Sequence, residues 1–134
     1  MIAEPRVLEG YKIFVAEDDH DIQAFMKTIL EQCGASVTIV SDGSAAIEVL
    51  LHESFDVALM DIEMPICSGF EAVGKIRAAG YGKPIVAISS RYRDENFDHP
   101  FANCFNEKLP KPVNLPVLIQ TIKHFSRNAS PTPH

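Results

Sequence analysis

Short runs of apolar residues alternate along the chain with longer stretches in which apolar residues recur every three or four positions. The run at residues 57–60 is uninterrupted, which is typical of a strand that is buried on both faces of a sheet. Pro65 follows shortly afterwards and cannot continue a strand ladder. The pattern as a whole predicts strands at residues 12–16, 37–40, 57–60, 85–88 and 103–107.

The stretches between these runs have the apolar spacing of amphipathic helices. Helices are expected between Asp19 and Gly34, over residues 44–52 and 70–79, and from Asn114 to about Phe125. Asp19 or Asp21 is the expected N-cap of the first helix, and Asn114 that of the last. Pro100 would cost about 3 kcal/mol inside a helix, so we expect residues 91–103 to form only a short or irregular fourth helix.

Short buried strands that alternate with amphipathic helices are typical of an α/β fold, a doubly wound parallel sheet covered by helices on both faces. Residues 108–112 contain two prolines and are expected to form a turn after the fifth strand. With right-handed crossovers, the carboxyl ends of the first, third, fourth and fifth strands lie along one edge of the sheet.

Polar residues with a common chemistry follow these strand ends. Glu17 and Asp18 come after the first strand and Asp61 after the third, while Ser89 ends the fourth and Lys111 follows the fifth. Carboxylates that meet at one edge repel each other unless a cation lies between them, and hard oxygen ligands suit Mg²⁺. The hydroxyl and the lysine suggest a phosphoryl group as a further ligand, with Asp61 as its nucleophile. A solvated acid at a strand end is the alternative interpretation of Asp61.

Composition limits the class of protein further. The chain has 134 residues, 46% of them hydrophobic, which suffices for one domain with a core. A net charge of −6 argues against a nucleic-acid-binding surface, and no apolar run reaches the roughly 18 residues of a membrane span. The three cysteines lack metal-site spacing, so we expect reduced thiols in the cytoplasm. We expect a lead-in over residues 1–10, one domain over 11–127 and a disordered tail over 128–134.

Five motifs in order make the chain resemble a receiver domain of two-component response regulators. They lie at residues 15–19, 59–65, 68–71, 84–89 and 110–112. The resemblance implies a flavodoxin-like sheet with strand order 2-1-3-4-5 and phosphorylation of Asp61 by a sensor histidine kinase or a histidine phosphotransfer domain. The site residues that it implies are Glu17, Asp18, Asp61 and the backbone carbonyl of Glu63 for Mg²⁺, and Ser89 and Lys111 for the phosphoryl group.

The chain departs from the family pattern at one position of the expected switch. Lys108 stands three residues before Lys111, where the family usually has an aromatic residue. Glu63 and Arg91 lie two residues beyond Asp61 and Ser89, at positions that resemble those tuning the lifetime of the phosphoryl group. We therefore expect Glu63 and Arg91 to pair over the site and to affect hydrolysis.

The main hypothesis is a signalling domain that catalyses its own phosphorylation and is not an enzyme with an outside substrate. Its output would pass through contacts with a downstream protein, without direct binding of nucleic acid. Two alternatives stay open at this point. One is an interaction module of the same fold that works without phosphorylation, which Lys108 would favour. The other is a phosphatase-like enzyme with Asp61 as nucleophile and Glu63 as a second acid.

Overall fold

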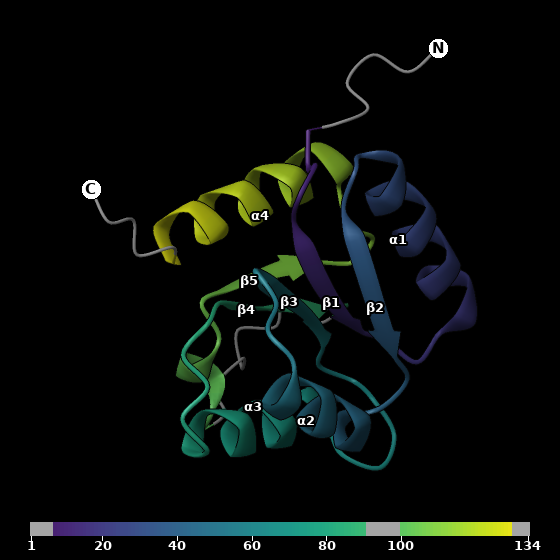
Figure 1. Cartoon of the computed structure of the whole chain (residues 1–134). Helices are drawn as coiled ribbons and strands as arrows, with labels where there is room; N and C mark the ends of the chain where they lie inside the picture. Colours follow the sequence, from purple (N-terminus) through teal and green to yellow (C-terminus); the bar gives the residue numbers. More distant parts are fainter. Residues whose placement is uncertain (1–6, 91–99, 130–134) are drawn as a thin grey trace.

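A parallel sheet of five strands forms the centre of the molecule (Figure 1). The computed structural model describes residues 7–90 and 100–129. The strands are β1 (Lys12–Ala16), β2 (Ser36–Val40), β3 (Val57–Asp61), β4 (Ile85–Ser89) and β5 (Glu107–Pro110). Their order in the sheet is β2-β1-β3-β4-β5, so the predicted flavodoxin-like topology is confirmed.

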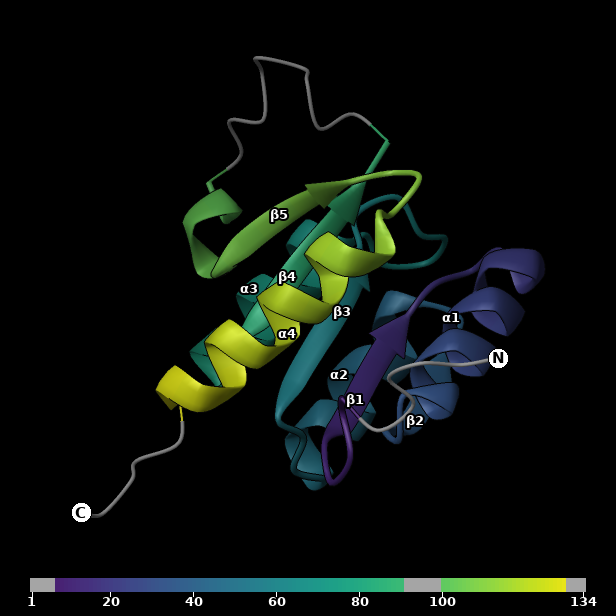
Figure 2. The same cartoon turned by 90° about the horizontal axis from the view of Figure 1, so that it is seen from above.

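Two pairs of helices cover the two faces of the sheet, as Figure 1 shows. The helices are α1 (His20–Gln32), α2 (Gly43–His52), α3 (Gly69–Ala78) and α4 (Leu115–Ala129), with a short 3₁₀ helix η1 at Ala102–Cys104. The cluster under α1 and α4 includes Leu30 and Ile122, whereas the cluster under α2 and α3 includes Leu50 and Ile76. In the view of Figure 2, α4 lies across the sheet, and the arrows of β1, β4 and β5 point to the same side.

Side chains at the helix ends explain where the helices begin. The Asp19 carboxylate accepts hydrogen bonds from the backbone N–H groups of Asp21 and Ile22, which confirms Asp19 as the N-cap of α1. Ser68 and Glu71 form a reciprocal capping box at the start of α3. Asn114 accepts from the backbone N–H of Val117, as expected for a residue that caps α4.

The predicted fifth strand was misplaced. β5 covers Glu107–Pro110 rather than residues 103–107, so the first part of the predicted turn at 108–112 is strand. Leu109 is the residue of β5 that enters the core, while Cys104 and Phe105 pack beside the α2–α3 cluster. The Phe105 ring lies 5.9 Å from that of Phe70 on α3. Cys104 and Phe105, the apolar pair that suggested a strand, therefore pack η1 and the residue after it against the helices of this face.

Three other predictions fall partly outside the described residues. Of the expected fourth helix, residues 91–99 lie outside, and the described part holds a turn and η1 rather than an α-helix. Of the expected lead-in, residues 7–10 are described, and Leu8 is fully buried in the core. α4 continues to Ala129, which lies within the segment that was predicted as a tail. Within the described ranges, each helix is too short or too polar to span a membrane.

The first turn of α3 touches the end of β3 so closely that it requires glycine at position 69. A Cβ atom on Gly69 would lie 2.5 Å from the backbone oxygen of Asp61 and 2.8 Å from the Cα of Ile62. Both neighbours are backbone atoms, which cannot move aside as a flexible side chain would. Glycine at position 69 thus allows the start of α3 to pack directly against the end of β3, which carries Asp61.

We predict that Gly69→Ala lowers the free energy of unfolding by roughly 1–3 kcal/mol, because the new methyl group overpacks a backbone contact. Gly82→Ala is the matched control, since nothing lies within 4 Å of a Cβ at Gly82 and its φ is not positive. Urea denaturation of the two variants and the parent protein measures the difference. Equal midpoints for the two variants would show that the contact at Gly69 relaxes without cost.

Candidate active site

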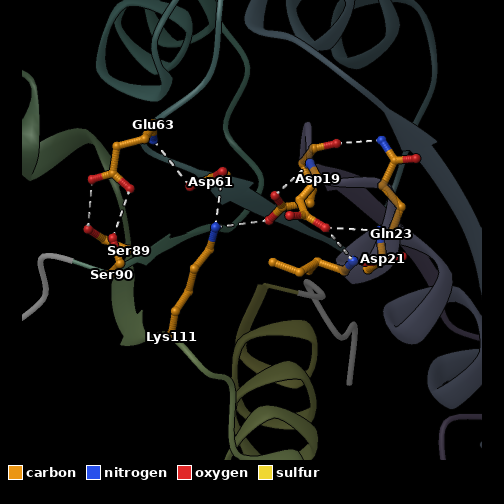
Figure 3. Close-up of polar contacts among 10 residues, drawn as sticks. Asp19, Asp21, Gln23, Asp61, Glu63, Ser89, Ser90 and Lys111 are labelled. Atoms are coloured by element: carbon orange, nitrogen blue, oxygen red, sulfur yellow. Dashed lines mark hydrogen bonds and ion pairs between the residues drawn. The ribbon is translucent and has the colours of Figure 1, made fainter.

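The predicted site residues lie together at the carboxyl ends of four strands (Figure 3). Glu17 directly follows β1, Asp61 is the last residue of β3, Ser89 is the last of β4, and Lys111 directly follows β5. The backbone N–H of Lys111 donates to the carbonyl of Ser89 at 3.1 Å, which ties the end of β5 to the end of β4. A cleft of about 520 Å³ opens beside Glu17, Asp61 and Lys111.

Lys111 is shared between two buried carboxylates. Its Nζ lies 3.2 Å from Oε1 of Glu17 and 3.2 Å from Oδ2 of Asp61. Asp61 and Glu17 expose only 2% and 3% of their surface, although one ends β3 and the other directly follows β1. Water therefore screens these charges poorly, and each carboxylate depends on Lys111 for compensation.

The balance of burial and charge changes the acidity of two groups. Burial, together with the neighbouring Glu17 carboxylate, raises the pKa of Asp61 from 3.8 to about 7, although Lys111 and the Glu63 N–H oppose the change. Burial by itself lowers the pKa of Lys111, but the carboxylates of Asp61 and Glu17 outweigh it, so the pKa is raised and Lys111 stays charged. Two carboxylates with one ammonium ion leave room for a further positive charge.

The acidic residues fit a divalent cation of the Mg²⁺ type. Glu17, Asp18 and Asp61 each offer a carboxylate oxygen, and these oxygens lie within 4.8 Å of one another. Asp18 is exposed, whereas Glu17 and Asp61 are buried, so the cluster opens toward solvent on one side. Hard oxygen ligands combined with open positions for water suit Mg²⁺ better than a soft metal. The predicted role of the Glu63 backbone carbonyl stays a prediction.

Backbone and side-chain contacts fix the orientation of the acids. The backbone N–H of Glu63 donates to Oδ1 of Asp61 at 3.2 Å, and that of Asp19 donates to Oε2 of Glu17 at 3.0 Å. The Gln23 side-chain amide donates to the Glu17 carbonyl and to the Ser41 hydroxyl. Asp19 thus both caps α1 and orients Glu17. These contacts leave the other oxygens of both carboxylates facing Lys111.

The Glu63 side chain has a place that the sequence analysis did not predict. Its Oε2 lies 3.4 Å from the Ser89 hydroxyl and its Oε1 lies 3.4 Å from the Ser90 hydroxyl (Figure 3). The sequence analysis assigned no role to Ser90. The pair of adjacent serines after a strand was the signal in the sequence that pointed to a second hydroxyl here.

Two predicted site residues are not tested by these contacts. Arg91 lies outside the described residues, so its pairing with Glu63 stays a prediction. Lys108 lies in β5 opposite Ala87 of β4, and its backbone N–H donates to the Glu107 carboxylate. Its proposed influence on the switch also stays a prediction.

A known protein family has the same sequence pattern over most of this chain. Residues 13–123 match the family model of the response regulator receiver domain. The chain belongs to the receiver domain family. Two-component systems use such domains, so the resemblance inferred from the five motifs is confirmed.

Individual relatives of this receiver domain occur both as short proteins and within long ones. An uncharacterised 14.6 kDa protein of Leptolyngbya boryana is 30% identical over 90% of this chain and 93% of its own length. Hybrid signal transduction histidine kinase I of Dictyostelium discoideum is 34% identical over 89% of this chain, which spans only 8% of that kinase.

A solved structure of similar sequence and shape carries a metal at the corresponding kind of site. It is the receiver domain of sensor histidine kinase PA1611 from Pseudomonas aeruginosa, with a magnesium ion coordinated in its active-site cleft. It is 27% identical to this receiver domain, covers 88% of this chain and 98% of its own, and has a TM-score of 0.82.

The raised pKa of Asp61 makes a prediction about stability in the metal-free protein. Because the folded-state pKa of about 7 exceeds the ordinary 3.8, stability that is present below pH 4 is lost as the pH rises toward 7. We expect Asp61→Asn to raise the free energy of unfolding by roughly 1–3 kcal/mol at about pH 8, and to change it little at about pH 4. Urea denaturation in the presence of a chelator measures both values.

Glu48→Gln is the control for this experiment, because the Glu48 side chain is 77% exposed and lies on α2. It should change the unfolding free energy little at either pH. If Asp61→Asn also left the neutral-pH stability unchanged, the charged Asp61 would not be a strained group in the folded protein.

Proposed function

We propose that this receiver domain accepts a phosphoryl group on Asp61 in a Mg²⁺-dependent reaction. The donor is a phosphohistidine of a sensor histidine kinase or of a histidine phosphotransfer protein. The observation that carries the proposal is the Asp61 carboxylate itself, which is 2% exposed, receives the Glu63 N–H and lies 3.2 Å from the Lys111 ammonium. A merely solvated acid at a strand end would have neither the burial nor these partners.

Positioning and charge compensation are what phosphoryl transfer requires of a protein. A carboxylate oxygen of Asp61 forms a bond to phosphorus while the P–N bond of the phosphohistidine breaks, and the departing imidazole nitrogen takes up a proton. Lys111 already lies beside Asp61 and offers its charge to the oxygens of the incoming group. Ser89, at the adjacent strand end, offers a hydroxyl as a further donor.

Glu17, Asp18 and Asp61 are the residues that would hold Mg²⁺. The bound ion supplies positive charge that offsets the acids and the phosphoryl oxygens. A magnesium ion in the active-site cleft of the PA1611 receiver domain supports this assignment by similarity.

The protein would act as a switch rather than as an enzyme with an outside substrate. The phosphoryl group adds charge at the strand ends, which changes the contacts that the domain makes with a downstream protein. We place the protein in the cytoplasm, and the free thiols of Cys33, Cys67 and Cys104 are compatible with that reducing compartment.

Intact mass after incubation with acetyl phosphate and Mg²⁺ tests the proposal. We expect a gain of one phosphoryl group that disappears in Asp61→Asn and in the presence of a chelator. Lys111→Ala should slow the gain roughly 10²-fold or more, because it removes the donor that compensates the developing charge. Glu48→Gln, an exposed acid on α2, is the matched control and should react like the parent protein.

A mass gain that persisted in Asp61→Asn would contradict the assignment of Asp61. If the protein does not react with acetyl phosphate, it is titrated with beryllofluoride in the presence of Mg²⁺. Beryllofluoride mimics a phosphoryl group on a carboxylate and needs no transfer step. No binding in that titration would overturn the proposed function.

A further inference from the structure

The Glu63 carboxylate bridges two hydroxyl groups at the end of β4. One oxygen lies 3.4 Å from the hydroxyl of Ser89, which is 1% exposed, and the other lies 3.4 Å from the hydroxyl of exposed Ser90. Glu63 itself follows β3, so the contact crosses from one strand end to the next (Figure 3). We call this group of Glu63, Ser89 and Ser90 the Glu63 clamp.

The clamp competes with the phosphoryl group for Ser89. A serine hydroxyl has a single proton, and while it is donated to the Glu63 carboxylate it is unavailable to a phosphoryl oxygen. The negative charge of Glu63 would also lie against the negative oxygens of a phosphoryl group that Ser89 bound. Ser89 can therefore bind the phosphoryl group only after its contact with Glu63 is broken.

Ser90 determines how easily that contact breaks. It holds the second oxygen of Glu63, so the carboxylate remains oriented toward Ser89. Both distances are long for hydroxyl-to-carboxylate hydrogen bonds, so each bond is weak and the clamp can open without a large cost. Ser90 thus adds a small free-energy preference for the state in which Ser89 contacts Glu63 over the state in which Ser89 binds a phosphoryl group.

We propose that the Glu63 clamp stabilises the unphosphorylated state by holding Ser89, and that Ser90 is a positioning residue acting through Glu63. The inference rests on the proposed function, because it assumes that Ser89 binds the phosphoryl group on Asp61. It gives Glu63 a role that does not depend on pairing with a cation. The clamp therefore lowers the affinity of the site for a phosphoryl group, because the group binds Ser89 only in the open state.

Beryllofluoride titration by calorimetry, with saturating Mg²⁺, tests the clamp. We expect Ser90→Ala to raise the affinity about threefold and Glu63→Ala about tenfold, since the latter also removes a repelling charge. The double variant Glu63→Ala, Ser90→Ala should bind like Glu63→Ala alone, because Ser90 has then lost its partner. Ser90→Thr keeps the hydroxyl and should retain the parent affinity. The Glu63→Ala change leaves the backbone carbonyl in place for Mg²⁺.

A second readout needs no ligand. Urea denaturation of the same variants in a chelator should show non-additive midpoints for Glu63→Ala and Ser90→Ala, as expected for residues in contact. Both side chains are exposed, so the variants are expected to fold.

The outcomes separate the clamp from the proposed function. If the parent protein does not bind beryllofluoride, the proposed function fails and the clamp with it. If the parent binds but Ser90→Ala has no effect, or has the same effect with and without Glu63, the clamp is wrong and the proposed function stands. Additive midpoints in the chelator would likewise overturn the clamp.

Discussion

Two buried carboxylates that share one ammonium ion are the constraint on which the site depends. Glu17 follows β1 and Asp61 ends the adjacent strand β3. The Lys111 Nζ lies 3.2 Å from a carboxylate oxygen of each. Burial and mutual repulsion raise the pKa of Asp61 to about 7, so one lysine does not fully compensate the pair. The fold thus holds excess negative charge at the place where a divalent cation and then a phosphoryl group would bind.

The position of Lys111 follows from the pairing of β4 with β5. Ser89 pairs with Pro110, and the next backbone N–H, that of Lys111, donates to the Ser89 carbonyl at 3.1 Å. The same residue therefore anchors the lysine through its backbone and offers its hydroxyl to the clamp. Ser89 therefore links the clamp to the residue whose ammonium group compensates Asp61.

The sequence allowed most of the fold to be predicted because each buried strand is a short apolar run between amphipathic helices. The side chains that follow such strands could be assigned to one edge, and Glu17, Asp61, Ser89 and Lys111 do meet there. The contacts of Glu63 with Ser89 and Ser90 could not, since they depend on the conformation of the loop after β3. β5 was misplaced because apolar spacing alone does not distinguish an edge strand from a segment packed against α3.

An arginine of α3 helps to hold the polar strand β5 in place. The half-buried Arg77 of α3 donates to the carbonyls of Tyr81, Lys83 and Cys104 at 2.7–3.0 Å. It also donates to the Asn106 side chain, whose oxygen accepts the backbone N–H of Ile85, each at 2.8 Å. These bonds join the end of α3, the start of β4 and the residue before β5. Only Leu109 of β5 is buried, so these charge-assisted bonds add to the β4–β5 pairing in holding the strand that is followed by Lys111.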